Sequence, residues 1–138
     1  MPKITMWNLI KTVVIFSIFF LLASCHEGYV SKDGEPLKKY IEPTALKTLV
    51  ENPDDNIWLI DVRPASSYNK GFIPGARSFP SSTILNRLDE LPKEKYLIFY
   101  CETGGRAQRV IKKLEEKGYT KMMNWGGSGR WEWEFEKP

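Results

Sequence analysis

The chain has 138 residues, a length that allows one domain with one sizeable core and excludes a large multidomain assembly. Hydrophobic residues make up 42% and charged residues 27% of the sequence, a globular composition without the charge excess of a disordered chain. The net charge is +3, and two of the cations, Lys3 and Lys11, lie in a leading segment without acidic residues. The nearly neutral remainder argues against a nucleic-acid-binding protein, and the single histidine argues against a histidine-ligated metal centre or a Cys/His protease.

The first 24 residues have the three-part layout of a signal peptide. Positive charge in residues 1–11 is followed by an apolar stretch of about eleven residues from Val13 and then by small residues before Cys25. Because a helix needs ~20 apolar residues to cross the hydrocarbon core, a permanent transmembrane anchor is the weaker interpretation. Residues 22–25, Leu-Ala-Ser-Cys, resemble the lipobox of bacterial lipoproteins, in which cleavage leaves the cysteine as a lipid-carrying N-terminus.

This resemblance implies a mature protein that begins at Cys25 and is attached to a membrane through lipid. It would lie in the bacterial cell envelope, outside the cytoplasm, on the periplasmic face of the outer or inner membrane. An uncleaved anchor, or secretion with Cys25 free, is the alternative. Residues 25–38 are polar and show no apolar period, so we expect a flexible tether in which His26 is solvated.

From Tyr40 onward, short β-rich runs alternate with helical stretches, which is the pattern of an α/β domain with a central, mostly parallel β-sheet flanked by helices. Pro43 is placed as the first-turn proline of a helix predicted to end near Asn52. Residues 57–60 are predicted to form a strand covered on both faces. Residues 61–64 follow it and include the polar Asp61 and Arg63, at the end of a strand where open α/β sheets place their sites.

Turn residues at 71–75 precede a predicted short strand over 76–79 and a helix capped by Ser81 or Ser82 that runs towards Leu91. A second fully apolar strand, 96–100, leads directly into residues 101–106. The next helix is indicated by four apolar residues at helical spacing: Ala107, Val110, Ile111 and Leu114.

Gly118 is predicted to stop that helix, and a last strand over 121–124 leads into a glycine-rich bend over 125–131. On the helix, Arg109 and Lys112 are expected to form a solvated face. Three tryptophans are expected to pack at an edge of the core: Trp125, Trp131 and Trp133.

Cys101 is the candidate nucleophile. If Cys25 is lipidated, Cys101 is the only remaining thiol in a compartment where cysteines usually form disulfides, so a free thiol there is expected to have a use. It lies between a strand and a helix, where backbone N–H groups and the positive end of the helix converge and favour a thiolate. Gly104 and Gly105 allow a close backbone approach, and Arg106 adds a permanent positive charge. A buried structural cysteine, a simple tight turn and a Cys25–Cys101 disulfide are the alternatives.

Three blocks of the sequence resemble the rhodanese (thiosulfate sulfurtransferase) family in its small single-domain form. The blocks are 59–63 with Tyr68 and 71–76, the loop 100–106 with its CxxGxR pattern, and 118–119 with 126–127 and Trp131. The resemblance implies a single rhodanese-like domain over residues 39–138, with a central parallel sheet flanked by helices. We expect no cofactor and no metal.

By this resemblance, Cys101 would attack the outer sulfur of a donor such as thiosulfate or a persulfide, hold it as a persulfide and pass it to cyanide or a thiol. Loop N–H groups would bind the anionic sulfur, and Arg106 would orient the oxyanion end of the donor. The implied partners are therefore a small-molecule sulfur donor and a thiol or cyanide acceptor, with the oligomeric state left open. Asp61 and Arg63 would support the loop rather than react. The substrate-binding residues of the loop would be Glu102, Thr103, Gly104 and Gly105.

Two residues depart from the pattern of the family. Phe72 stands where the family usually has histidine, which leaves the expected fold intact. Glu102 places a carboxylate beside the nucleophile, so a dianion such as thiosulfate is expected to be a poor donor.

Two other functions are compatible with parts of this loop. A cysteine phosphatase or arsenate reductase is the weaker enzyme alternative, because only four residues separate Cys101 from Arg106 where those enzymes have five. The alternative from another class is a non-catalytic, membrane-tethered binding module of the same fold. Such a module would be expected to have lost the cysteine or the arginine, and this chain has both.

Overall fold

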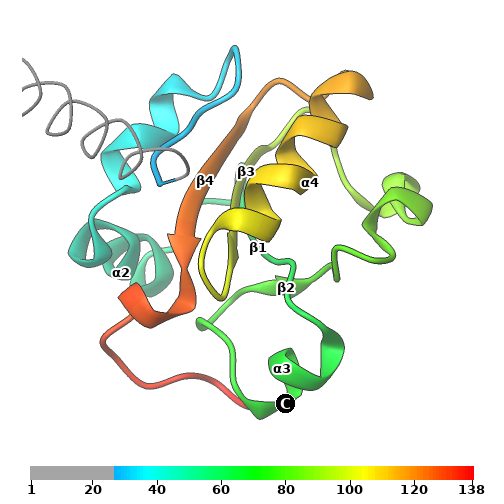
Figure 1. Cartoon of the computed structure of the whole chain (residues 1–138). Helices are drawn as coiled ribbons and strands as arrows, with labels where there is room; N and C mark the ends of the chain where they lie inside the picture. Colours follow the sequence, from blue (N-terminus) through cyan, green and yellow to red (C-terminus); the bar gives the residue numbers. More distant parts are fainter. Residues whose placement is uncertain (1–26) are drawn as a thin grey trace, which may run out of the picture.

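Four parallel strands in the order β2-β1-β3-β4 form the central sheet of the computed structural model, which describes residues 27–138 (Figure 1). The α/β fold with a parallel sheet, expected from the alternating pattern, is confirmed. The strands are β1 (Ile57–Asp61), β2 (Arg77–Ser78), β3 (Tyr96–Cys101) and β4 (Met122–Gly127).

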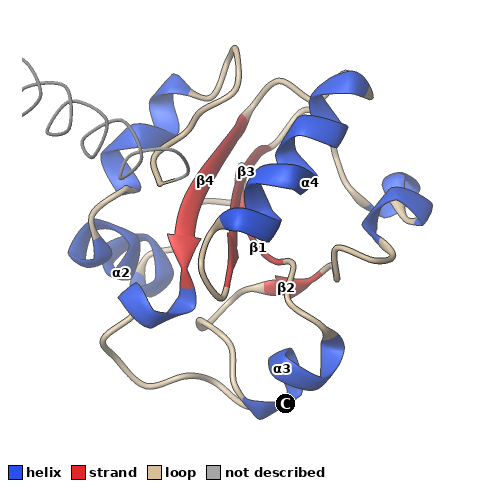
Figure 2. Ribbon diagram, viewed as in Figure 1, coloured by secondary structure: helices blue, strands red, loops and turns tan. Residues whose placement is uncertain are grey.

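Helices and single 3₁₀ turns connect and cover the strands (Figure 2). The α-helices are α2 (Pro43–Glu51), α3 (Ala65–Lys70) and α4 (Gly105–Glu116). The 3₁₀ helices are η1 (Glu35–Tyr40), η2 (Ile84–Asn86), η3 (Leu88–Glu90) and η4 (Ser128–Arg130). In the view of Figure 2, α4 lies in front of the sheet.

The sheet separates two hydrophobic clusters, because successive residues of a strand point to opposite faces. The α4 side of the sheet receives alternate residues of β3: Leu97, Phe99 and Cys101. The side of α2 and η1 receives the residues between them: Ile98 and Tyr100. The three tryptophans expected at an edge of the core belong to this second cluster: Trp125, Trp131 and Trp133.

A bulge in β4 sets the register at the carboxyl end of the sheet. Asn124 pairs with Phe99 but Gly126 pairs with Tyr100, so Trp125 is left without a partner across the ladder. The extra residue brings Gly127 level with Cys101. Parallel strands end at the same edge, and the nucleophile candidate therefore lies beside the glycines of β4.

A buried polar network holds the turn at residues 71–73 against the ends of β1 and β3. The Arg63 guanidinium donates to both carboxylate oxygens of Asp61 and, from Nη2, to the carbonyl of Gly71 at 2.7 Å. The Tyr100 hydroxyl donates to Asp61 Oδ2 at 2.8 Å and accepts from the N–H of Ile73 at 3.1 Å. Asp61 and Arg63 thus support the loops around the site, as the sequence suggested.

The Tyr100 phenol and the Arg63 guanidinium of this network both have raised pKa values. Burial raises the pKa of the Tyr100 phenol, and the negative charge of Asp61 raises it further. Burial acts to lower the pKa of Arg63, but the hydrogen bonds and charge interactions with Asp61 and Tyr100 together outweigh that effect, and the pKa is raised. The phenol therefore keeps its proton as a donor and the guanidinium keeps its charge at neutral pH.

Residues 27–38, the described part of the predicted flexible tether, are packed against the domain. The N–H of Gly28 donates to the carbonyl of Asn124 at 2.8 Å, and that of Ser31 donates to Met122 at 3.0 Å. The physical reason is the free edge of β4, whose N–H and C=O groups would otherwise lack partners. The predicted signal peptide, Cys25 and His26 lie outside the described residues. From residue 27 to residue 138, no helix is long and apolar enough to cross a membrane.

Two further local predictions differ from the structure. The helix predicted from Ser81 or Ser82 towards Leu91 is wrong, because η2 and η3 replace it. The turn begins where the N–H of Ile84 donates to the carbonyl of Pro80, and the irregular path buries both Ile84 and Leu91. The short helix α3 was not predicted, because it contains no buried residue and hence no apolar period.

Candidate active site

Cys101 is the last residue of β3, and the chain turns sharply after it into α4. Its side chain is 1% exposed, and its sulfur accepts a hydrogen bond from the N–H of Gly104 at 3.0 Å. Gly104 has a left-handed conformation with φ of +91°, which other residues rarely adopt, and it is the N-cap of α4. The loop therefore curls back on itself so that the N–H of Gly104 points at the thiol.

The end of β4 lies directly against this loop. A Cβ atom added to Gly127 would lie 2.4 Å from the carbonyl oxygen of Glu102 and 3.1 Å from the Cα of Thr103. One added to Gly104 would lie 3.1 Å from the Cα of Gly126. Glycine at these two positions is thus required by close backbone approach, which explains Gly127 of the closing sequence block.

Asn124 connects the loop, α4 and β4, and sequence reasoning missed it. Its Nδ2 donates to the carbonyl of Gly104 and to Oε1 of Gln108, both at 3.0 Å. Its Oδ1 accepts from the N–H of Gly126 at 3.0 Å. The signal available in the sequence was an amide within an otherwise apolar predicted strand, because a buried amide must find several hydrogen-bond partners.

Glu102 and Thr103 are exposed on the outer side of the loop. An open cavity of about 480 Å³ borders Glu102, whose Oε1 lies 3.4 Å from the Ser67 hydroxyl. Cationic, polar and aromatic side chains line the rest of this cavity, which we call the Glu102 cavity: Arg63, Ser67, Lys70, Ser128, Trp131 and Phe135. Glu102, which follows the predicted nucleophile in the chain, lines this cavity, and Cys101 itself does not.

Arg106, the second residue of α4, lies beside that helix. Its side chain lines a separate cavity of about 120 Å³ beside α4, and it does not line the Glu102 cavity. Its Nη1 is buried and has no hydrogen-bond partner among the described residues. The loop therefore presents a carboxylate on one side and a guanidinium on the other.

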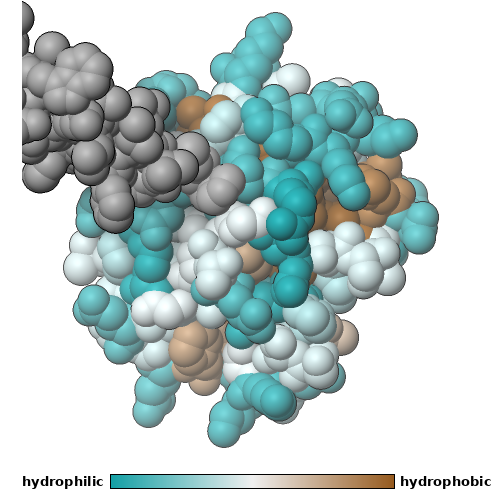
Figure 3. All heavy atoms as spheres, viewed as in Figure 1, coloured by the Kyte–Doolittle hydropathy of each residue, from teal (hydrophilic) through white to brown (hydrophobic). Residues whose placement is uncertain are grey.

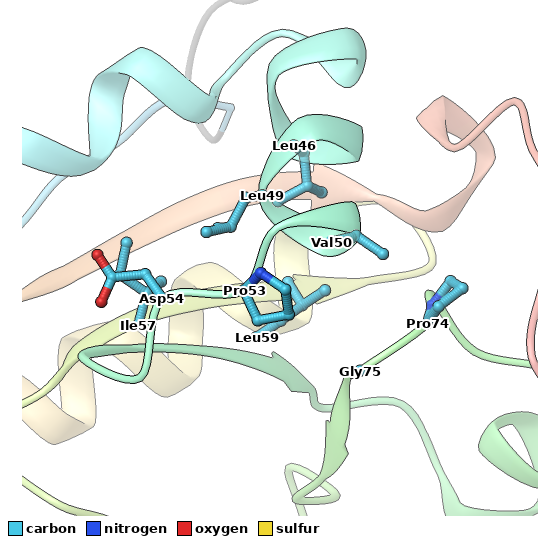
Figure 4. A pocket seen from close by; sticks show the side chains of 9 residues that line it. All are labelled: Leu46, Leu49, Val50, Pro53, Asp54, Ile57, Leu59, Pro74 and Gly75. Carbon is cyan, nitrogen blue, oxygen red and sulfur yellow. The ribbon is translucent and has the colours of Figure 1, made fainter.

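A third cavity, of about 70 Å³, lies between α2 and β1 (Figure 4). Figure 4 shows Pro74 across this cavity from Val50 of α2. Its lining is mostly aliphatic and holds no nucleophile, so we assign it no part in the chemistry.

Cys101 is a free thiol in the described part of the chain. Over residues 27–138, no group of three or more His, Cys, Asp or Glu side chains is arranged to hold a metal ion. What the site offers is a sulfur atom in contact with a backbone N–H group at the start of a twelve-residue helix. Such an arrangement places a backbone donor where negative charge would develop on sulfur during a displacement.

Comparison with known proteins identifies similar chains. Residues 42–132 match the family model described as a rhodanese-like domain. The chain is 35% identical over 96 residues to the putative sulfurtransferase YtwF of Bacillus subtilis, covering 70% of this chain and 92% of that protein. It is 33% identical over 96 residues to the thiosulfate:glutathione sulfurtransferase of Saccharomyces cerevisiae, covering 60% and 69%. A crystal structure of a rhodanese-like domain protein from Staphylococcus aureus is similar with a TM-score of 0.62 at 26% identity, covering 70% and 95%.

We expect Gly127→Ala to lower the free energy of unfolding by about 1–3 kcal/mol, the usual cost of overpacking. The reason is that its Cβ would be 2.4 Å from the Glu102 carbonyl oxygen, so the loop or β4 must move. Gly129→Ala is the matched control, because nothing lies within 4 Å of a Cβ at that position. Urea unfolding of both variants measures the difference, and equal stabilities would contradict the packing argument.

Proposed function

The chain belongs to the rhodanese-like domain family, and we propose from this that it is a sulfurtransferase in which Cys101 carries the transferred sulfur. The observation that carries the proposal is the position of Cys101, a free thiol at the carboxyl end of a central parallel strand, with the Gly104 N–H 3.0 Å from its sulfur. Relatives named sulfurtransferases support the same activity.

The proposed reaction has two displacement steps at sulfur. The Cys101 thiolate attacks the outer sulfur of the donor, a new S–S bond forms, and the donor's own bond to that sulfur breaks. The leaving group, sulfite or a thiolate, departs with the electron pair. A cyanide or thiolate acceptor then attacks the outer sulfur of the persulfide. The S–S bond to Cys101 breaks, the product leaves as thiocyanate or as a new persulfide, and the Cys101 thiolate is regenerated.

The loop stabilises the anionic sulfur in both steps. The Gly104 N–H already donates to the Cys101 sulfur, and the first turn of α4 leaves further N–H groups without helical partners. The close contact with Gly127 holds this backbone in place. Arg106, which the resemblance assigns to the oxyanion end of the donor, also lines the cavity beside α4.

Glu102 bears on the choice of donor. Its carboxylate borders the cavity next to Cys101, where Arg63 and Lys70 provide positive charge. A dianion such as thiosulfate is repelled by the carboxylate, whereas a persulfide with a single charge is repelled less. We therefore propose a persulfide as the preferred donor and a thiol as the acceptor.

We also propose that the protein is a lipoprotein anchored through Cys25 in the bacterial cell envelope, outside the cytoplasm. The proposal rests on the lipobox resemblance. Glu27 forms an ion pair with Arg130 at 3.5 Å, just beyond the end of β4. Because two residues span at most about 7 Å, a lipid on Cys25 would hold this edge of the domain close to the membrane surface.

Cys101→Ser is expected to abolish sulfur transfer and to leave the domain folded, because the change replaces one sulfur atom by oxygen. Intact mass spectrometry of the full chain in detergent, after incubation with a persulfide donor or thiosulfate, should show one added sulfur atom. Cyanide should remove it as thiocyanate. An adduct on the Cys101→Ser protein would refute the role of this thiol, and no adduct on the unaltered protein with either donor would favour the binding module.

Glu102→Gln is expected to raise kcat/KM for thiosulfate about fivefold at low ionic strength, and less at high salt, because it removes a charge that repels the donor. Glu116→Gln at the far end of α4 is the control, roughly 18 Å along the helix. Steady-state assays with thiosulfate and cyanide measure both variants. An equal response of the two variants would show that the Glu102 charge has no influence on the donor.

Cys25→Ser is expected to abolish lipid attachment. Bacteria that express the protein are fed an alkyne fatty acid, and the purified chain is tested for label. Cys101→Ser is the control and should keep the label. Labelling of Cys25→Ser, or none on the unaltered protein, would disprove anchoring through this cysteine.

A further inference from the structure

Three cationic side chains of α4 line the 120 Å³ cavity, which we call the α4 cavity. They are Arg106, Arg109 and Lys113, spaced three and four residues apart, so they lie along one face of the helix. The remaining wall combines one hydroxyl with aliphatic groups: Ser81, Ile84, Leu85 and Val110. In Figure 3, hydrophilic side chains cover the exposed face of α4 beside a hydrophobic patch over the η2–η3 segment.

No carboxylate lines the α4 cavity, and within the described residues none of its three cations forms an ion pair. The neighbouring Lys112 is different, because it lies 3.6 Å from the Glu115 carboxylate and donates to the Tyr29 hydroxyl at 2.8 Å. Like charges that share a cavity repel one another. The cavity therefore has a positive potential that no side chain of its own lining neutralises.

The Arg106 guanidinium adds an unmet hydrogen-bonding group. Its Nη1 is buried without an acceptor in the described structure. A buried N–H group without a partner is unfavourable, and it is rare in folded proteins. An anion bound in the cavity would balance the positive charge of the three side chains that line it.

We propose that the α4 cavity binds one tetrahedral oxyanion, a phosphate or sulfate group, either free or at the end of a larger molecule. Two guanidinium groups suit such a group, because their paired N–H donors match its oxygens. Lys113 adds a third charge and Ser81 a hydroxyl donor. The volume of about 120 Å³ accommodates one such group rather than a nucleotide. The aliphatic part of the wall lowers the local polarity, which strengthens charge interactions.

This site goes beyond the proposed sulfur transfer, because Cys101 does not line it. It adjoins the loop only through Arg106, the second residue of α4. Binding there can therefore be measured on a protein that lacks the thiol, and its failure would be distinguishable from failure of the sulfurtransferase proposal.

The test is calorimetric titration of the full chain in detergent with inorganic phosphate and with sulfate at low ionic strength. We expect saturable binding of one anion, weakened about tenfold or more by Arg109→Ala and by Lys113→Ala, because each removes charge-assisted hydrogen bonds. Lys112→Ala removes the same charge from the same helix outside the cavity and should bind as the unaltered protein does. Cys101→Ser should also bind normally.

Glycerol phosphate serves as a second probe for the source of the group. Tighter binding than inorganic phosphate would indicate a terminal phosphate of a larger molecule, and weaker binding would indicate a free anion. Absence of saturable binding would overturn the proposal. So would an equal loss of affinity in the Lys112→Ala and Lys113→Ala proteins, which would mean general attraction to a basic helix.

Discussion

The close approach of β4 to the loop after β3 is the constraint on which the site depends. Gly127 lies so near the Glu102 carbonyl oxygen that a methyl group has no room between them. The bulge at Trp125 produces this register. Asn124 hydrogen-bonds to the loop, to α4 and to β4, and so connects all three. The conformation around Cys101 is therefore held by the packed backbone of the neighbouring strand, and the N–H of Gly104 is already in place at the thiol.

The two sides of the loop carry opposite charge. Glu102 borders the open cavity at the carboxyl edge of the sheet, while Arg106 lies in the α4 cavity. The division follows from the start of the helix, because Glu102 lies in the turn and Arg106 lies within the first turn of α4. The proposed donor site and the proposed anion site thus lie in separate cavities, although the two residues are close in the sequence.

Two features stabilise the strands around the site: the segment that pairs with the edge of β4, and the buried polar network at the end of β1. The segment from Gly28 to Ser31 pairs with β4 and satisfies the groups of its edge. At the end of β1, Asp61 accepts hydrogen bonds from Arg63 and Tyr100, and these two side chains in turn bind the backbone of the turn at 71–73. An anchor at Cys25 would transmit its position to the domain through the first of these contacts.

The sequence by itself determined the α/β class, the two central strands, α4 and the placement of Cys101 between strand and helix, because these depend on local apolar patterns and on glycine. Only the tertiary structure decided the direction of Arg106, the role of Asn124, the glycine contact and the pairing of residues 27–38. Each of these depends on groups far apart in the chain. A local pattern shows which face of an element is buried, but the partner that a polar group finds is set by the packing of all the elements together.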